Sequence, residues 1–298
     1  MRKLAFIGLG NMGGGMAANQ AKAGHDVAAF DLSAAALEKA AAAGCRPCAS
    51  VAEALAGAEA VITMLPAGPH VRSVYSEQVF ASAPQGALLI DCSTIDVDSA
   101  RTVASQSRER GFRFADAPVS GGTAAAEAGT LAFMVGCDEA DFPAVEEVIS
   151  PMARVVFRAG DHGAGQAAKI CNNMLLGISM IGTCEAIALA ERLGLDPLRF
   201  FEIASQSSGQ CWSITSYYPW PGAVPTAPSN RGYTGGFSTA MMLKDLKLAQ
   251  EAAARSGAAA PLGAQAEGLY ALFERLGGGG KDFSAILELL RGNAPAQD

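Results

Sequence analysis

A glycine-rich turn between a short apolar run and a helical segment is the feature that most constrains how this chain folds. Leu4–Ile7 is an apolar run of strand length, and Gly8, Gly10 and Gly13 follow it with the spacing G-x-G-x-x-G. Gly8 permits a tight turn because glycine has no Cβ, and Gly13 allows the following helix to pack closely on the strand. We therefore predict that the chain begins with a strand, a tight turn and a helix.

Apolar runs alternate with helical segments through the first half of the chain. Ala-rich segments such as Ser33–Ala43 and Val97–Arg110 have helical spacing and lie between the apolar runs. This alternation predicts a mostly parallel sheet wrapped by helices, which is an α/β Rossmann domain. The predicted strands are Leu4–Ile7, Val27–Phe30, Ala60–Leu65, Ala87–Asp91, Phe112–Ala115 and Leu131–Val135.

The pattern changes near residue 160, after which the signals are helical. A long segment, Gly165–Leu193, is hydrophobic on nearly every face and is predicted to be a helix buried between two domains. Residues 219–236 indicate a long irregular loop. We predict a Rossmann domain at 1–162, a connecting helix at 163–193 and an all-α domain at 194–298. The later predicted helices are Pro197–Ser205, Thr239–Ser256, Pro261–Arg275 and Ser284–Leu290.

The glycine-rich turn, in this context, indicates a dinucleotide site. Gly10 lets a pyrophosphate approach the backbone, and the N-terminus of the following helix favours phosphate, so Asn11 and Met12 of the turn are also expected at the cofactor. Asp31 ends the second predicted strand. A carboxylate there accepts hydrogen bonds from ribose hydroxyls and repels a 2′-phosphate, which favours NAD over NADP. The alternative for Asp31 is a helix N-terminal residue.

Two further strand ends are expected to face the same cofactor, because ligands bind at the carboxyl ends of parallel strands. Leu65 ends one predicted strand and is followed by Pro66, and Thr94 follows another. Thr94 is positioned to bond the nicotinamide ribose. It is also suited to be the N-cap of the next helix, and both roles are compatible.

The stretch Asp116–Gly122 combines a strand end, a proline turn and two glycines. Ser120 offers a hydroxyl, and the backbone N–H groups of Gly121 and Gly122 can form an anion-binding concavity. This chemistry suits a carboxylate. An ordinary Gly-Gly loop is the alternative that the stretch alone leaves open.

Lys169 lies near the start of the long apolar helix, where lysine is unusual. Burial lowers the pKa of a lysine toward neutrality, so it can exchange a proton with a substrate hydroxyl. Asn173 shares a helix face with Lys169 at i+4 and is predicted to hold the substrate or the lysine. A salt bridge or a surface lysine remains the alternative. Lys244, Asp245 and Lys247 are predicted to lie on a solvated helix face.

Composition excludes several classes of protein. The net charge of −7 argues against nucleic-acid binding. Seven cysteines form no disulfide framework, which fits a reducing, cytoplasmic setting, and Cys45 and Cys48 lack the second ligand pair of a metal site. We therefore expect no bound metal. No uninterrupted apolar stretch reaches the ~18 residues of a membrane span, so no membrane association is expected.

Together these motifs resemble the β-hydroxyacid dehydrogenase family, most closely the 3-hydroxyisobutyrate dehydrogenases, over nearly the whole chain. The order of several separate motifs makes a chance match improbable. The matching segments are Phe6–Gly13, Asp91–Thr94, Asp116–Gly122, Gly129–Leu131, Gly163–Asn173, Gly235–Phe237 and Lys244–Leu246.

The resemblance implies NAD-dependent oxidation of a small β-hydroxy acid, such as 3-hydroxyisobutyrate in valine catabolism or L-serine, to a semialdehyde or keto acid. The substrate is then a small carboxylate. Separately, the apolar helices suggest self-association, as a homodimer or homotetramer. The resemblance assigns acid/base catalysis to Lys169 with Asn173; substrate binding to Ser120, Gly121, Gly122, Trp212 and Tyr217; and cofactor binding to Phe237 and Lys244. Without it, Trp212 and Tyr217 either line a pocket or serve plain packing, which is the more common role of aromatic residues.

One departure from the family pattern concerns Gly15, where relatives usually have proline. Glycine costs roughly 1 kcal/mol in a helix, so a looser helix start and weaker cofactor binding are expected. Four alternative functions share parts of the pattern. They are a reductase of the tartronate or succinic semialdehyde type, a 6-phosphogluconate dehydrogenase-like enzyme, an imine reductase-like enzyme and a non-catalytic dinucleotide-binding scaffold.

Overall fold

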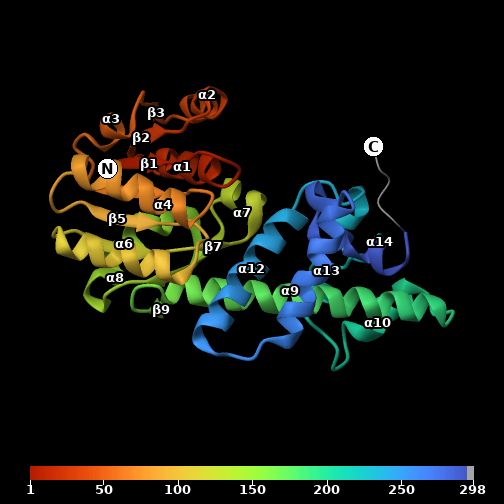
Figure 1. The fold of residues 1–298 in the computed structure, drawn as a ribbon. Helices are drawn as coiled ribbons and strands as arrows, with labels where there is room; N and C mark the ends of the chain where they lie inside the picture. The colour runs from red at the N-terminus through yellow and green to blue at the C-terminus, as the bar shows by residue number, and fades with distance from the viewer. Residues whose placement is uncertain (294–298) are drawn as a thin grey trace. The chain divides into compact units, whose positions relative to one another are not determined.

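The computed structural model describes residues 1–293. The chain divides into two compact units, Met1–Lys169 and Ile170–Asp298. The first is a sheet covered by helices and the second is helical (Figure 1). The predicted fold class, a Rossmann domain followed by an all-α domain with a long helix, is confirmed.

A run of parallel strands forms the larger part of the sheet. Each strand pairs in register with its neighbour, and the order β3-β2-β1-β4-β5-β6 reverses direction across the sheet at β1. All the predicted strands are present, and each end lies within two residues of the prediction. The parallel strands are β1 (Lys3–Ile7), β2 (Asp26–Phe30), β3 (Arg46–Pro47), β4 (Ala60–Thr63), β5 (Leu88–Asp91) and β6 (Arg113–Asp116).

Three strands complete the sheet beyond β6. β8 (Leu131–Gly136) is antiparallel to β6 and to the short β7 (Val119–Ser120), and β9 (Ala153–Gly160) is parallel to β8. The sequence reading missed β3, β7 and β9. β3 and β7 have only two residues each, which is too short for a recognisable pattern. β9 carries two arginines and no fully buried side chain, so it has no clear apolar run.

Two hydrophobic cores lie on opposite faces of the sheet, because successive side chains of a strand point to opposite sides. Leu4 and Phe6 of β1 belong to one core, and Ala5 and Ile7 belong to the other. The first core contains residues of α1 (Gly13–Lys22), α2 (Ala34–Ala42), α7 (Gly122–Ala128) and α8 (Phe142–Ile149). The second contains residues of α3 (Val51–Leu55), α4 (Gly68–Val74), the π-helix Tyr75–Val79 and α6 (Val97–Glu109).

The long helix α9 (Ala164–Arg192) is only partly buried. Leu175 and Leu189 are 63% and 60% exposed, so the prediction of burial along the whole helix is wrong. By length and composition alone α9 could cross a membrane, with 44% of its most apolar window buried inside the protein. The core helix of a soluble protein meets the same criterion, so this composition identifies no membrane span.

The C-terminal unit is built from helices with recognisable ends. Asp196 caps α10 (Pro197–Ala204), whose first residue is proline, and Ser238 caps α12 (Thr239–Ser256), which ends at the left-handed Gly257. Their apolar faces meet in a core with Met180, Tyr270 and Phe273 among its members. The remaining helices are α11 (Trp212–Thr215), α13 (Pro261–Arg275), α14 (Ile286–Leu290) and the 3-10 turns Pro228–Arg231, Gly278–Gly280 and Phe283–Ala285.

Candidate active site

The glycines of the first turn differ in what requires them. Gly8 has φ +94°, and a Cβ there would collide with the carbonyl oxygen of Met64. A Cβ at Gly13 would collide with the carbonyl oxygen of Gly8, so α1 can approach β1 only with glycine at this position. Gly10 is exposed, and a Cβ there would meet no protein atom within 4 Å. Packing within the protein explains Gly8 and Gly13 but not Gly10, as expected if Gly10 faces a bound pyrophosphate.

We expect Gly10→Ala and Gly13→Ala to fail in different ways. At Gly10 the new methyl obstructs only a ligand, so NADH affinity falls about tenfold while the melting temperature is kept. At Gly13 the methyl forces α1 away from β1 and lowers the free energy of unfolding by about 1–3 kcal/mol. Thermal unfolding and NADH fluorescence titration measure the two effects. A Gly10→Ala protein with unchanged NADH affinity would contradict the role given to Gly10.

Asp31 lies directly after β2, and its carboxylate is tied to the glycine-rich turn. Oδ2 accepts a hydrogen bond from the N–H of Leu9 at 2.6 Å, and Oδ1 accepts one from the N–H of Ser33 at 2.8 Å. Ser33 is the N-cap of α2, so Asp31 is not itself a helix residue. Each carboxylate oxygen has a further lone pair, which leaves acceptors for ribose hydroxyls.

The strand ends at Leu65 and Ser93 are joined by a buried hydrogen-bond network. The N–H of Leu65 donates to Ser93 Oγ at 2.8 Å, and Ser93 Oγ donates to Asp91 Oδ1 at 2.6 Å. Thr63 Oγ1 also donates to Asp91 Oδ1, at 2.7 Å. Asp96, not Thr94, is the N-cap of α6, so the capping alternative for Thr94 is wrong. The network holds the backbone of the two strand ends that precede Pro66 and Thr94.

Asp91 makes stability depend on pH. Burial raises the pKa of Asp91 to about 7, although hydrogen bonds from Ser93 and Thr63 favour its charged form, and Oδ2 has no hydrogen-bond partner. The pKa of this carboxyl is therefore higher in the folded state than in the unfolded state, where it is near 4. Its contribution to the free energy of unfolding is fully present when the pH is below about 4 and is lost as the pH rises through about 7.

We expect Asp91→Asn to flatten the pH dependence of stability. Asn cannot ionise, and its Oδ1 keeps both hydroxyl donors, so the loss of a few kcal/mol between pH 5 and pH 8 disappears in the variant. Urea unfolding of both proteins at the two pH values measures the difference. Burial also raises the pKa of Asp116. Asp116 is present in both proteins, so its contribution differs between them only through its charge interaction with Asp91. If the free energy of unfolding changed equally with pH in the two proteins, Asp91 would not be the origin of the pH dependence.

The segment predicted as a Ser-Gly-Gly loop is more ordered than expected. Ser120 ends β7 and pairs with Ala132 of β8, and Gly122 is the first residue of α7. Gly121 and Gly122 have φ values of +140° and +71°, which L side chains rarely adopt. A Cβ at Gly121 would crowd the Ala125 side chain, whereas one at Gly122 would meet no protein atom within 4 Å. As at Gly10, local packing leaves the surroundings of Gly122 open.

Gly15 has a packing role that the sequence reading missed. A Cβ at Gly15 would lie 2.9 Å from the backbone of Ala126 and Glu127 in α7. Asn19 Nδ2 donates to the carbonyl oxygens of Ala126 at 2.7 Å and Glu127 at 3.2 Å. The glycine therefore lets α1 approach α7 closely, where we expected only a looser helix start.

Lys169 is 7% exposed, so the surface-lysine alternative is wrong. It lies in the second turn of α9, whose start is held by Asp116 at the end of β6. Asp116 Oδ1 accepts a hydrogen bond from the N–H of Gly163 at 2.6 Å, and Oδ2 accepts one from the N–H of Gln166 at 2.9 Å. A Cβ at Gly165 would collide with the carbonyl oxygen of Met134, so glycine lets the helix begin against the sheet.

Asn173 lies one turn beyond Lys169 on α9 and is almost fully buried. Its Nδ2 donates to Asp245 Oδ2 at 2.5 Å, and its Oδ1 accepts from Asn172 at 3.0 Å. Lys244 Nζ lies 3.8 Å from Asp245 Oδ1. Asp245 is 3% exposed, so the prediction that it lies on a solvated face is wrong, while Lys247 is exposed as predicted.

The other predicted site residues of the C-terminal unit lie around one buried carboxylate. Trp212 is half exposed and stacks on Tyr217, with ring centroids 4.8 Å apart. The Tyr217 hydroxyl donates to Asp282 Oδ2 at 2.7 Å, and the N–H of Phe237 donates to the same oxygen at 2.8 Å. The sequence reading missed Asp282. Its only signal was an acidic residue that follows the glycine run 277–280 and Lys281.

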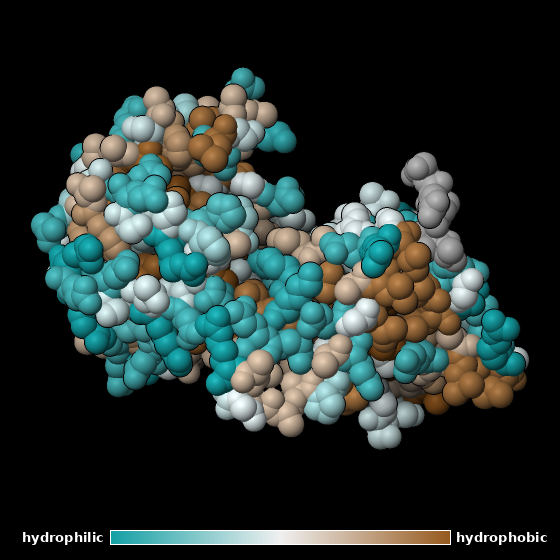
Figure 2. All heavy atoms as spheres, viewed as in Figure 1, coloured by the Kyte–Doolittle hydropathy of each residue, from teal (hydrophilic) through white to brown (hydrophobic). Residues whose placement is uncertain are grey.

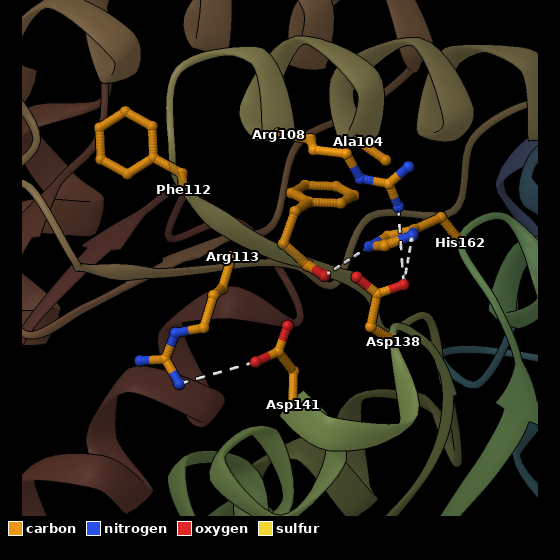
Figure 3. A pocket seen from close by; sticks show the side chains of 8 residues that line it. Ala104, Arg108, Phe112, Arg113, Asp138, Asp141 and His162 are labelled. Atoms are coloured by element: carbon orange, nitrogen blue, oxygen red, sulfur yellow. Dashed lines mark hydrogen bonds and ion pairs between the residues drawn. The ribbon is translucent and has the colours of Figure 1, made fainter.

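None of the predicted site residues lines the cavity of about 80 Å³ drawn in Figure 3. Its polar groups bond one another: Asp138 Oδ1 lies 3.6 Å from Arg108 and 3.7 Å from His162, and His162 Nε2 lies 3.0 Å from the carbonyl oxygen of Phe114. Cys45 and Cys48 are buried, and burial raises the pKa of Cys45 to about 11, which disfavours a thiolate. Within residues 1–293 no three His, Cys, Asp or Glu side chains are grouped to hold a metal ion.

The geometry defines a class of protein. A doubly wound sheet has a first turn open to a ligand at Gly10 and an acidic residue at the end of β2, and a buried lysine lies on the helix that follows β9. These are the features of a nicotinamide-dependent oxidoreductase.

Comparisons with known proteins specify the family. Residues 3–160 match the NAD-binding domain of 6-phosphogluconate dehydrogenase, and residues 163–290 match the NAD-binding domain of NADP-dependent 3-hydroxyisobutyrate dehydrogenase. The chain is 49% identical to a 3-hydroxyisobutyrate dehydrogenase of Pseudomonas aeruginosa, over 98% of this chain and 99% of that protein. It is 46% identical to an NAD-dependent L-serine dehydrogenase of the same organism, over 97% and 98% of the two chains.

A solved structure agrees with this assignment. The 3-hydroxyisobutyrate dehydrogenase of Mycobacterium tuberculosis with L-serine is 47% identical and superposes with a TM-score of 0.94, over 98% of this chain and 99% of that one. The chain belongs to the 3-hydroxyisobutyrate dehydrogenase family. It is an NAD-dependent oxidoreductase, as predicted.

Proposed function

We propose that this protein oxidises a small β-hydroxy acid, 3-hydroxyisobutyrate or L-serine, to the corresponding semialdehyde or keto acid with NAD. The observation that carries this proposal is the burial of Lys169 on a helix whose start is bonded to Asp116. Asp116 opens the segment that leads to Ser120, Gly121 and Gly122. The names of two relatives, a 3-hydroxyisobutyrate dehydrogenase and an L-serine dehydrogenase, support the substrate class.

The residues divide the work of the reaction. The Ser120 hydroxyl and the N–H groups of Gly121 and Gly122 bind the substrate carboxylate, which orients the hydroxyl carbon. Lys169 Nζ accepts the hydroxyl proton as the C–O bond becomes a carbonyl. Bound NAD⁺ supplies the acceptor for the hydride, that is, the hydrogen and both electrons of the broken C–H bond. The residues that would hold this cofactor are Gly8–Gly13, Asp31, Leu65, Pro66 and Thr94.

The roles of the remaining predicted residues rest on the family resemblance. Asn173 assists Lys169 from the same helix face, and its buried bond to Asp245 supports a positioning role. Trp212 and Tyr217 contact the substrate, and Phe237 and Lys244 contact the cofactor. Trp212 stacks on Tyr217 and is half exposed, which is consistent with a ligand-facing surface.

Cofactor reduction followed at 340 nm and alkaline pH tests the function. NAD and NADP are each assayed with 3-hydroxyisobutyrate, L-serine, 3-hydroxypropionate, glycerate and 6-phosphogluconate. Turnover of a small hydroxy acid with NAD supports the proposal, and turnover of none of them overturns it. A clear preference for 6-phosphogluconate, or activity only with a semialdehyde and NADH, would establish one of the alternatives instead.

We propose further that the protein is a homodimer or homotetramer in the cytoplasm. An apolar groove of about 490 Å³ lies between α9, α10 and α11, and Leu189, Leu193 and Ile203 expose 57–76% of their surface. Figure 2 shows hydrophobic surface gathered over the helical unit. Exposed apolar patches of this kind usually mark interfaces. Light scattering of the wild type and of Leu189→Glu, which places a charge on this surface, tests the oligomeric state. A monomeric wild type would refute it.

The proposed cytoplasmic location is supported by the free cysteines, which fit a reducing compartment.

A further inference from the structure

A buried glutamine links the helix of Lys169 to the strand end that precedes α6. Gln166 is fully buried, and its side chain forms two hydrogen bonds to one backbone segment. Nε2 donates to the carbonyl oxygen of Ser93 at 2.7 Å, and Oε1 accepts from the N–H of Ile95 at 3.1 Å. These two groups flank Thr94, so the carboxamide fixes the backbone on both sides of that residue.

The same glutamine is fixed at its own backbone. Its N–H donates to Asp116 Oδ2 at 2.9 Å, and Asp116 lies opposite Asp91 in the register of β5 and β6. Gln166 precedes Lys169 by three residues, so the two side chains are neighbours on the helix surface. One residue therefore bonds two adjacent strand ends and lies one turn from the lysine.

We propose that Gln166 is a positioning residue that sets the distance between Lys169 and the strand end at Thr94. This inference rests on the proposed function, in which Thr94 holds the nicotinamide ribose and Lys169 takes the hydroxyl proton. The side chain of Gln166 bonds the backbone at Ser93 and Ile95, and we assign it no contact with substrate or cofactor. It acts by holding the proton acceptor and the cofactor-binding backbone in one arrangement, and misplacement of reacting groups by about 1 Å can cost on the order of 100-fold in rate.

Gln166→Leu tests the proposal because leucine is of similar size and removes both side-chain bonds. We expect kcat to fall about 10- to 100-fold, with a smaller change in the KM for the hydroxy acid. The deuterium isotope effect on kcat, measured with substrate labelled at the carbon that loses the hydride, rises because chemistry becomes slower than product release. NADH binds several-fold more weakly, because Thr94 is released.

Gln20→Leu is the matched control. Gln20 is equally buried, and its Nε2 donates to the carbonyl oxygen of Val148 at 2.7 Å, so its loss also removes a buried bond from the same unit. The control is expected to lower the melting temperature but to keep the isotope effect and the NADH affinity. If the two variants lose activity in proportion to their stability, Gln166 is merely structural and the proposal fails.

Two further measurements decide the outcome if Gln166→Leu folds poorly or is hard to interpret. Gln166→Glu keeps an acceptor for Ile95 but loses the donor to Ser93, so it should show an intermediate isotope effect. At saturating NAD, the double variant with Lys169→Met should lose less activity than the two single losses combined, because both substitutions disturb the same arrangement of lysine and cofactor-binding backbone. Additive losses would overturn the proposal. If the wild type oxidises no hydroxy acid, the proposed function fails, while an NADH affinity unchanged by Gln166→Leu overturns the link to Thr94 independently.

Discussion

We expect Lys169→Met to lower kcat about 10²- to 10⁴-fold, the loss typical when a general base is removed. Lys169 is only 7% exposed, and methionine fills the buried space that the lysine stem occupies. The start of α9 therefore stays intact. The bonds of Asp116 to Gly163 and Gln166 involve backbone N–H groups and persist in the variant. The NADH affinity and melting temperature should therefore change little, and the loss should appear in the chemical step.

Steady-state kinetics with NAD and the best hydroxy acid measure this effect. Lys247→Met is the control, because Lys247 is exposed on α12 and has no proposed role. The isotope effect on kcat should increase in Lys169→Met and stay constant in Lys247→Met. A Lys169→Met enzyme within about threefold of the wild-type rate would remove the assignment of this lysine as the base.

The second large effect is expected at Asp31, where Asp31→Asn should reduce the preference for NAD over NADP about 10- to 100-fold. Loss of a charged hydrogen-bond acceptor weakens the ribose contact by about 1.5–3 kcal/mol and also removes the repulsion of a 2′-phosphate. Asparagine is the informative substitution because its Oδ1 can still accept from the N–H of Leu9 or of Ser33. The glycine-rich turn is then disturbed least.

The ratio of kcat/KM for the two cofactors is the measured quantity. Asp26→Asn serves as a control, since Asp26 lies at the opposite end of β2. Its ratio should equal that of the wild type. A wild type that prefers NADP, or an Asp31→Asn protein with an unchanged ratio, would refute the role of Asp31.

Local chemistry accounts for the parts of the fold that were predicted correctly. The strands β1, β2, β4, β5, β6 and β8 are apolar runs, and α10, α12 and α13 have clear starts at Pro197, Ser238 and Pro261. Errors arose where burial, not sequence pattern, defines an element. β9 has two arginines among its eight residues and no fully buried side chain, and Leu175 and Leu189 are exposed on a helix whose composition predicted full burial.

For the candidate site, the sequence identified residue types but not their partners. Gly8, Gly10, Gly13 and Asp31 follow from the spacing of a strand, a turn and a second strand, and Lys169 stood out as a charge in an apolar helix. Asp245 and Asp282 were missed or misassigned. A single acidic residue gives no sign of burial until the helices around it pack, and only then does its bond to Asn173 or Tyr217 become visible.

By itself, the sequence determined six strands of the sheet, the glycine-rich turn and the family, because each of these depends on short motifs of residues close together in the chain. Only the tertiary structure decided how Lys169 is held. Gln166 bonds residues 71 and 73 positions away, and Asp116 bonds residues 47 and 50 positions away. Such bonds exist because β5 and β6 lie side by side in the sheet and α9 begins against them. The glycine-rich turn could therefore be predicted from residue spacing. The hydrogen bonds that hold the helix of Lys169 could be identified only from the packed sheet.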